Sequence, residues 1–244
     1  MIMELIFTII LLAIAGPVIG SIIGVSRKPS KTVMYAVLSF AAGVMISISF
    51  LELLPESIAV SGILFASAGL TIGFVVMYIL DKSIPHIHPE LCSQEGDHKL
   101  KKTATFLLIG IFLHNFPEGL AMGVGSVTTM SLSLVIAIAI CIHDIPEGIC
   151  TSAPYYYVTK KRLRTFLVSS STAIPTVLGF LASYYFLQSL PDIVIGLVIA
   201  ATAGLMVYIS ADELIPTSCS NSGSHATIFS FMLGAVMVMM LGML

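Results

Sequence analysis

Long apolar stretches alternate with short polar joints along almost the whole chain. A helix needs about 20 apolar residues to cross a hydrocarbon core about 30 Å thick. Eight stretches reach this length, and the joints between them are short except for 81–102. We therefore predict an all-α membrane protein whose eight transmembrane helices form one transporter domain over 1–244. The predicted helices are at about 3–25, 32–54, 61–80, 103–124, 130–152, 165–188, 193–212 and 226–244.

Composition excludes the water-soluble classes. Hydrophobic residues make up 57% of the chain, charged residues only 10%, and the mean hydropathy is +1.03. A soluble domain carries about 25% charged residues, so lipid must be the solvent for most of this chain. A formal net charge of -2 without a broad basic patch also argues against nucleic-acid binding.

The basic residues predict the orientation of the helices. All eleven lysines and arginines fall in the first, third and fifth joints, which lie on one side in an eight-helix topology. Because basic loops stay in the cytoplasm, we expect a multi-pass protein of the cell membrane (the inner membrane) with both termini outside. These residues are Arg27, Lys28, Lys31, Lys82, Lys99, Lys101, Lys102, Lys160, Lys161, Arg162 and Arg164.

Two similar motifs lie in the fourth and fifth predicted helices. Residues 114–119 read His-Asn-Phe-Pro-Glu-Gly, and residues 143–148 read His-Asp-Ile-Pro-Glu-Gly. In each motif the polar side chains are three or four residues apart and share one helical face. If the two helices form an antiparallel hairpin turning near 130, His114 faces Glu147 and Glu118 faces His143. About ten residues at 1.5 Å each put the motifs about 15 Å from the turn, near the bilayer middle.

Ionisable groups at this depth are costly and therefore predict a function. Imidazole and carboxylate ligands suit Zn²⁺, Fe²⁺ or Mn²⁺ better than Ca²⁺ or Cu⁺. Asn115 and Asp144 would complete a second, more oxygen-rich position that shares both glutamates. Two carboxylates this close require a cation or a shared proton. Pro117 and Pro146 predict kinks that open the backbone where a transport site lines a cavity.

An internal repeat relates the second and seventh helices. Residues 42–57 and 203–218 are identical at nine of sixteen positions, and the two helices run in opposite directions in the predicted topology. Inverted repeats are typical of secondary transporters, so helices one to three would pair with six to eight around the kinked helices four and five. Met45, Glu52 and Glu213 are candidates for the pathway or a gate. The loop histidines His86, His88 and His98 either capture metal or are simply solvated.

These motifs together resemble the ZIP (Zrt/Irt-like) family of divalent metal-ion transporters, and in particular its bacterial ZupT-like branch. The resemblance implies a 3+2+3 helix arrangement and a binuclear site at the membrane centre. It implies a first metal position made by His114, Glu118, His143 and Glu147, with Met45 nearby. It implies a second made by Asn115, Glu118, Asp144 and Glu147, and an ion-screening role for Glu52. The branch places a glutamate where this chain has Ile174, which weakens the second position.

We therefore expect a secondary transporter that takes up divalent transition-metal ions by alternating access, and not an enzyme. Zinc is the favoured substrate, with iron, manganese and cadmium as further ions, and no ion serves as a cofactor. A metal-gated channel and a membrane metalloenzyme are the alternatives, although the sequence lacks the H-E-x-x-H pattern of zinc hydrolases. The expected partners are metal ions and the lipid bilayer. The sequence leaves the coupling ion and the oligomeric state open, a homodimer included.

Overall fold

The computed structural model describes residues 2–26, 30–83, 115–124, 128–219 and 225–243. Within these ranges every regular element is helical and no strand occurs. Six helical segments are long and apolar enough to cross a membrane, and Ala226–Leu241 is apolar but shorter. These are the features of a multi-pass helical membrane protein. The six long segments are Met3–Ser26, Thr32–Ser61, Ile63–Lys82, Met130–Ala153, Arg162–Ser189 and Asp192–Cys219.

Two of the long segments change from α-helical to π-helical hydrogen bonding along their length. A π-helical stretch, with bonds between residues five apart, interrupts each of them near one end. The helix over 115–124 begins at the edge of a range that is not described. The remaining elements are α1 (Ile2–Ser26), α2 (Lys31–Ser47), η1 (Ile48–Leu53), α3 (Leu54–Ser61), α4 (Ile63–Ser83), α6 (Met130–Thr159), α7 (Arg162–Ser170), α8 (Ala173–Phe186), η3 (Leu187–Ser189), α9 (Asp192–Ile209), η4 (Ser210–Leu214), α10 (Ile215–Cys219) and α11 (Ala226–Leu241).

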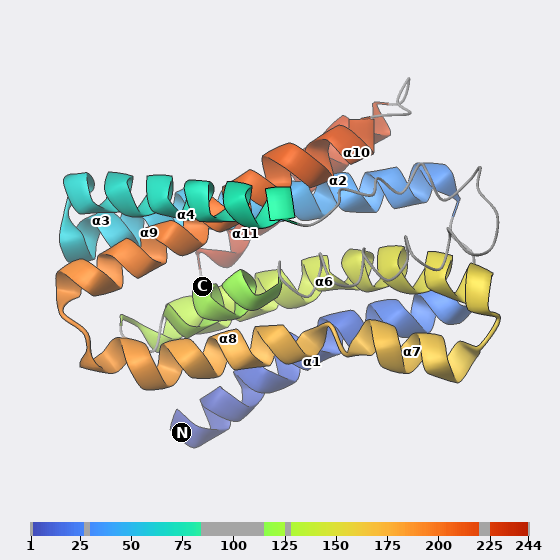
Figure 1. Cartoon of the computed structure of the whole chain (residues 1–244), viewed down its shortest axis with the longest axis horizontal. Coiled ribbons are helices and arrows are strands. Elements are labelled where there is room, and N and C mark those ends of the chain that lie inside the picture. The colour runs from blue at the N-terminus through green and yellow to red at the C-terminus, as the bar shows by residue number, and fades with distance from the viewer. Residues whose placement is uncertain (1, 27–29, 84–114, 125–127, 220–224, 244) are drawn as a thin grey trace.

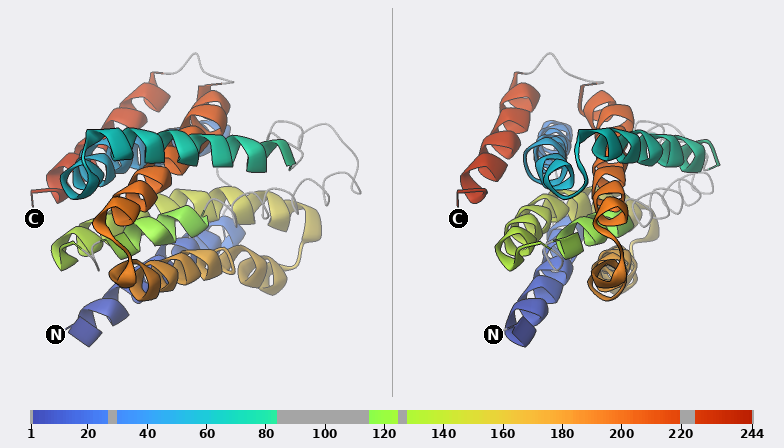
Figure 2. Two further views of the ribbon diagram at one scale, coloured as in Figure 1. Left: turned by 60° about the vertical axis from the view of Figure 1, so that its left-hand side comes forward. Right: turned by 90° about the vertical axis from the view of Figure 1, so that its left-hand side faces the viewer.

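The helices form two bundles that lie side by side along the long axis (Figures 1 and 2). The first bundle contains α1, the helix over 115–124, α6, α7 and α8. The second bundle contains α2, α3, α4, α9, α10 and α11, with α4 against α9 and α2 against α11. α2 also packs against α6 and so joins the two bundles. Segments distant in sequence therefore meet in both bundles.

Glycines set the distance between the helices of the first bundle. A Cβ atom added at Gly16 of α1 would lie 2.5 Å from the carbonyl oxygen of Cys141 and 2.6 Å from Cβ of Asp144. Gly20 lies in the same way against Gly148 of α6. Small residues let helices approach closely in lipid, where apolar burial gives little driving force for association. α1 and α6 are consequently held in backbone contact beside Asp144.

The π-helical segments occupy corresponding positions in the internal repeat. The N–H of Leu54 bonds to the carbonyl of Ser49, and the N–H of Ile215 bonds to that of Ser210, each five residues back. Both serines are fully buried, and each hydroxyl donates at 2.8 Å to a methionine carbonyl four residues earlier. Each π-helical segment is followed by one residue, Leu54 or Ile215, and then by a proline. The two copies of the repeat therefore share local structure as well as sequence.

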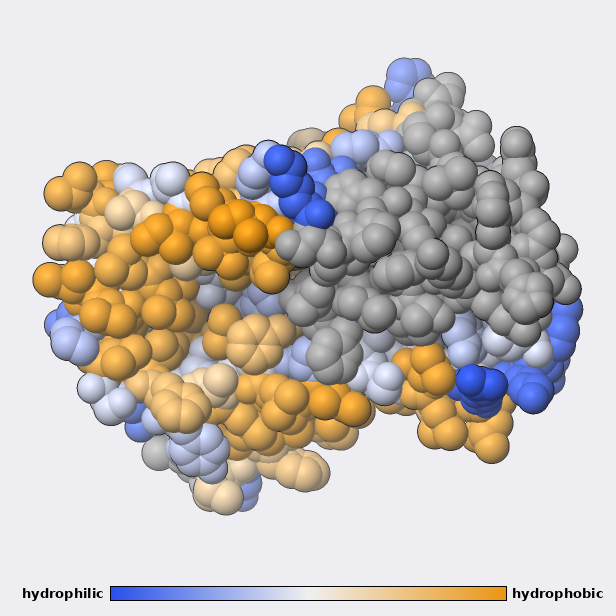
Figure 3. Space-filling model, viewed as in Figure 1, coloured by the Kyte–Doolittle hydropathy of each residue, from blue (hydrophilic) through white to orange (hydrophobic). Residues whose placement is uncertain are grey.

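The surface of the two helical bundles is apolar over much of its area. Figure 3 shows hydrophobic residues over the left-hand part of the view, and hydrophilic residues at the end where α6 turns into α7 and near the end of α4. Exposed side chains of α4 illustrate the apolar face: Ile72 is 52% exposed and Ile79 is 56% exposed. Such a surface is costly in water and favourable against acyl chains.

Candidate metal site

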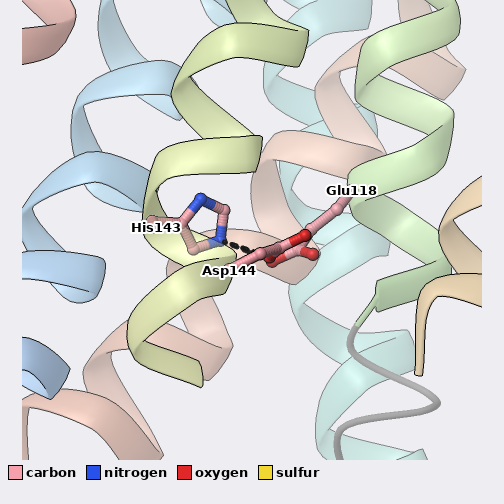
Figure 4. A group of neighbouring side chains, drawn as sticks. All are labelled: Glu118, His143 and Asp144. Carbon is pink, nitrogen blue, oxygen red and sulfur yellow. Dashed lines mark hydrogen bonds and ion pairs between the residues drawn. The ribbon is translucent and has the colours of Figure 1, made fainter. Parts of the chain in front are cut away.

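Two adjacent residues of α6 and one residue of the helix over 115–124 meet in the first bundle (Figure 4). Glu118 Oε1 lies 2.9 Å from His143 Nε2, and Asp144 Oδ1 lies 3.5 Å from the same nitrogen. One ligand atom from each of the three residues lies within 4.8 Å of the others. The hairpin spacing placed Glu118 opposite His143, and that prediction is confirmed.

These distances suit ligands of one transition-metal ion, or of two neighbouring ions that share a ligand. Ligands about 2.0 to 2.1 Å from a tetrahedral Zn²⁺ are about 3.3 Å from one another. The contacts of 2.9 and 3.5 Å that His143 Nε2 makes fall on either side of that value. Small movements of the side chains would therefore bring the three groups to ligand positions.

Burial makes a compensating positive charge necessary at this cluster. Glu118 and Asp144 are completely buried, and His143 is 1% exposed. The negative charges of Glu118 and Glu147 both act on the Asp144 carboxylate. Several carboxylates in a low-dielectric interior require protons or a cation to offset the cost of desolvation. The site is therefore built to hold positive charge.

The backbone orients the imidazole of His143. Nδ1 lies 3.3 Å from the carbonyl oxygen of Ala139, one turn earlier on α6. When Nδ1 carries the proton, it donates to that carbonyl and leaves Nε2 as the coordinating nitrogen. Nε2 is the atom that faces Glu118 and Asp144. The helix therefore presents the ring to the cluster in a ligand geometry.

Asn115 lies one turn from Glu118 and is also completely buried. Its amide nitrogen donates at 2.9 Å to the carbonyl oxygen of Thr172, at the break between α7 and α8. Its Oδ1 has no hydrogen-bond partner among the described residues. Because the amino group is committed to Thr172, Oδ1 is the atom left to accept a cation or a donor. Glu147, one turn beyond Asp144 on α6, is 8% exposed.

The other predicted residues are dispersed. Met45 is completely buried on α2, which packs against α6. Glu52 is half-buried in η1, and a Cβ added at Gly242 would lie 2.6 Å from its Oε1. Glu213 is exposed in η4, and neither glutamate belongs to the buried cluster. His114 and the histidines of the 81–102 loop (His86, His88 and His98) lie outside the described residues.

The structure adds two contributors that the motif did not reveal. Gly16 abuts Cβ of Asp144 from α1, and the Thr172 carbonyl holds Asn115 from the α7–α8 break. The recurrence of glycine at positions 16, 20 and 24 is a sequence signal for close helix packing. No comparable signal marks Thr172, because a backbone carbonyl can belong to any residue type.

Comparison with known proteins points to metal ions as the ligand, as the geometry of the cluster does. The family model described as ZIP zinc transporter matches residues 1–103 and 88–243. A protein named zinc transporter ZupT from Escherichia fergusonii is 38% identical over 214 residues, which cover 84% of this chain and 83% of the relative. Zinc transporter ZupT from Salmonella heidelberg (strain SL476) is 37% identical over 224 residues, covering 88% of this chain and 86% of the relative. The protein of the same name from Enterobacter sp. (strain 638) is 34% identical over 214 residues, covering 84% and 83%.

Proposed function

The chain belongs to the ZIP zinc transporter family, and we propose that it carries Zn²⁺ into the cytoplasm through the cluster around Glu118, His143 and Asp144. The observation that carries the proposal is the meeting of these three fully buried ligand groups within 4.8 Å. Family membership supports the uptake of divalent metal ions. Zinc as the main substrate, the inward direction and a two-ion site are the finer parts of the proposal, with Fe²⁺, Mn²⁺ and Cd²⁺ as further substrates.

We assign the ligands of two ion positions from the motifs. His114, Glu118, His143 and Glu147 bind the first ion, and Asn115, Glu118, Asp144 and Glu147 bind the second. Two features support this assignment: the Glu118–His143 contact and the unpartnered Oδ1 of Asn115. Met45 lies near the first ion, and Glu52 and Glu213 act on the path into and out of the site.

Transport follows from a relative movement of the two bundles. The three clustered ligands all lie in the first bundle, on α6 and the helix over 115–124. α1 and α6 are in backbone contact, and we expect them to move as one body. Displacement of the first bundle against the second would expose the cluster to one side of the bilayer and then to the other. The repeat around the π-helical segments supports the inverted 3+2+3 arrangement that such alternating access uses.

The basic joints set the direction in the membrane. We place the turns around residues 27–31 and 160–164 and the 81–102 loop in the cytoplasm, with both termini outside. The protein then spans the cell membrane in eight helices of a single domain. A homodimer is compatible with this arrangement, and mass measurement in detergent would test it.

Uptake into liposomes tests the proposed function. The purified protein is reconstituted in vesicles that contain a Zn²⁺-sensitive dye, and the initial rate is followed against external Zn²⁺. We expect saturable uptake, and Glu118→Gln should lower kcat/KM at least about tenfold, because changing even a group that only supports a metal ligand costs about 10- to 100-fold in metal affinity. Glu4→Gln, a matched change at an exposed position of α1, should leave the rate unchanged.

Each alternative gives a different result in the same assay. A metal-gated channel would give a flux that rises linearly with Zn²⁺ and does not saturate. A membrane metalloenzyme would give no uptake although it binds Zn²⁺. Either result would contradict the carrier proposal, and so would full activity of the Glu118→Gln variant.

A further inference from the structure

Many serine and threonine hydroxyls in the described helices donate to the backbone carbonyl four residues earlier. This bond needs no partner outside the helix, and serine and threonine within apolar helices commonly satisfy their hydroxyl donors in this way. The donor–acceptor distances in six such bonds lie between 2.8 and 3.0 Å. The pairs are Ser49 with Met45, Thr71 with Ser67, Thr151 with Glu147, Thr159 with Tyr155, Thr202 with Val198, and Ser210 with Met206.

Thr176 of α8 departs from this pattern. Its side chain is completely buried, yet Oγ1 has no hydrogen-bond partner among the described residues. The carbonyl four residues earlier belongs to Thr172, and that oxygen accepts the bond from the Asn115 amide at 2.9 Å. A carbonyl has two lone pairs, and an α-helix already uses one for the N–H four residues on. Asn115 therefore displaces the Thr176 hydroxyl from its ordinary acceptor.

The displaced hydroxyl belongs to the turn of α8 that lies against the ion ligands. A Cβ added at Gly119 would collide with the backbone of Thr176, so the two helices touch at this level. Gly119 directly follows Glu118, and Asn115 lies one turn before it on the same helix. Glu118 and Asn115 are both assigned to the second ion position. Thr176 therefore carries a buried hydroxyl on the neighbouring helix, at the level where α8 contacts Gly119.

No carboxylate from α8 competes for this role. The residue before Pro175 is Ile174, whose side chain is apolar and 53% exposed, whereas Thr176 is fully buried. Two residues turn an α-helix by about 200°, which places the two side chains on nearly opposite faces. Among residues 173–176, Thr176 is therefore the one whose buried side chain carries an oxygen.

We propose that Thr176 is a specificity-determining residue whose hydroxyl oxygen binds the second cation beside Asn115, Glu118 and Asp144. The inference rests on the proposed transport function and adds a ligand to that site. With Asn115 Oδ1 it makes the second position richer in oxygen ligands than the first. Oxygen ligands suit Mn²⁺, whereas Zn²⁺ accepts nitrogen and sulfur ligands readily. Thr176 therefore favours Mn²⁺ at the second position over the first.

Titration calorimetry on the purified full-length protein in detergent tests the inference with Mn²⁺ and Zn²⁺ as probes. Wild-type protein should bind two Mn²⁺ ions with different affinities. Thr176→Val, which removes the hydroxyl at nearly constant shape, should weaken the second Mn²⁺ at least about tenfold and leave Zn²⁺ at the first position within about twofold. Thr176→Ser keeps the hydroxyl and should retain the second ion.

Two comparisons separate a ligand from a packing residue. Thr202→Val is the matched control, because Thr202 is 1% exposed and its hydroxyl is satisfied by Val198. This control should leave both ions unchanged. Thr176→Ser is the second comparison, because it keeps the hydroxyl and removes only the methyl group, so it should also leave both ions unchanged.

The outcomes are distinct for the inference and for the transport function. The inference is overturned if Thr176→Val binds Mn²⁺ as wild type does, or if Thr202→Val weakens the second ion as much as Thr176→Val. It is also overturned if wild-type protein binds only one ion, and in that case binding that depends on His143 would leave the transport function standing. Absence of any Mn²⁺ or Zn²⁺ binding would overturn both.

Discussion

Replacing Gly16 with alanine should disturb the position of Asp144 in a way that ion binding can report. The new Cβ would lie 2.6 Å from Cβ of Asp144 and 2.5 Å from the Cys141 carbonyl oxygen. Carbon atoms in contact are about 3.5 to 4.0 Å apart, so α1 and α6 must separate by about 1 Å. Metal ligands tolerate deviations of about 0.2 Å from ideal distances. The second ion, to which we assign Asp144 as a ligand, should therefore lose at least about tenfold in affinity.

The same substitution also has a cost in folding. Forcing extra volume into a well-packed contact destabilises a protein by about 1 to 3 kcal/mol. Gly24→Ala provides the matched comparison, because Gly24 lies on the same helix against Ser152 and Ala153, two turns away from Gly16. Both variants should melt earlier in detergent, and calorimetry should show weaker binding of the second ion only in Gly16→Ala. Equal ion binding in the two variants would refute the link between α1 packing and Asp144.

Two further predictions follow from the site and the orientation. Zn²⁺ at about 100 times its Kd should add about 2.7 kcal/mol to the free energy of unfolding of wild-type protein and so raise its melting temperature. His143→Ala should lose this rise in melting temperature. The control His225→Ala, at an exposed position, should keep it. An equal shift in both variants would exclude His143 as a ligand. The orientation can be tested by cysteine labelling in a background without other reactive cysteines. Lys161→Cys should react with an impermeant maleimide only from the cytoplasmic side, and Gln188→Cys only from outside. The reason is that these exposed positions lie at opposite ends of the sixth span, beside α7 and in η3. Labelling from the opposite sides would reverse the proposed direction of the helices.

Sequence periodicity was sufficient to predict the contact at the centre of the site. The three- and four-residue spacings fix one face of each helix, and an antiparallel hairpin fixes which residues are opposite, so Glu118 and His143 could be paired. The helical membrane class followed in the same way from the length of the apolar stretches. Both conclusions depend on short-range geometry that the order of residues determines directly.

Long-range contacts and backbone details could not be predicted in this way. The Asn115–Thr172 bond joins residues 57 positions apart through a carbonyl, which every residue type possesses. α6 continues to Thr159, beyond the predicted boundary at 152, because hydropathy detects the apolar part of a helix and not its polar end. The repeat drew attention to residues 42–57 and 203–218, but identical letters do not reveal that both copies switch to five-residue hydrogen bonding.

The paired π-helical segments have a consequence for how the chain tolerates insertions and deletions. A wider turn accommodates one more residue than an α-helix would over the same length, so each of these spans carries a surplus residue just before its proline. Deleting one residue from 48–53 should therefore restore ordinary α-helical winding and leave the helix beyond Leu54 in nearly its present orientation. Ser57 would then keep the bond of 2.8 Å from its hydroxyl to the Gly196 carbonyl on α9. The surplus residue therefore lies outside the helical register that places Ser57 against α9.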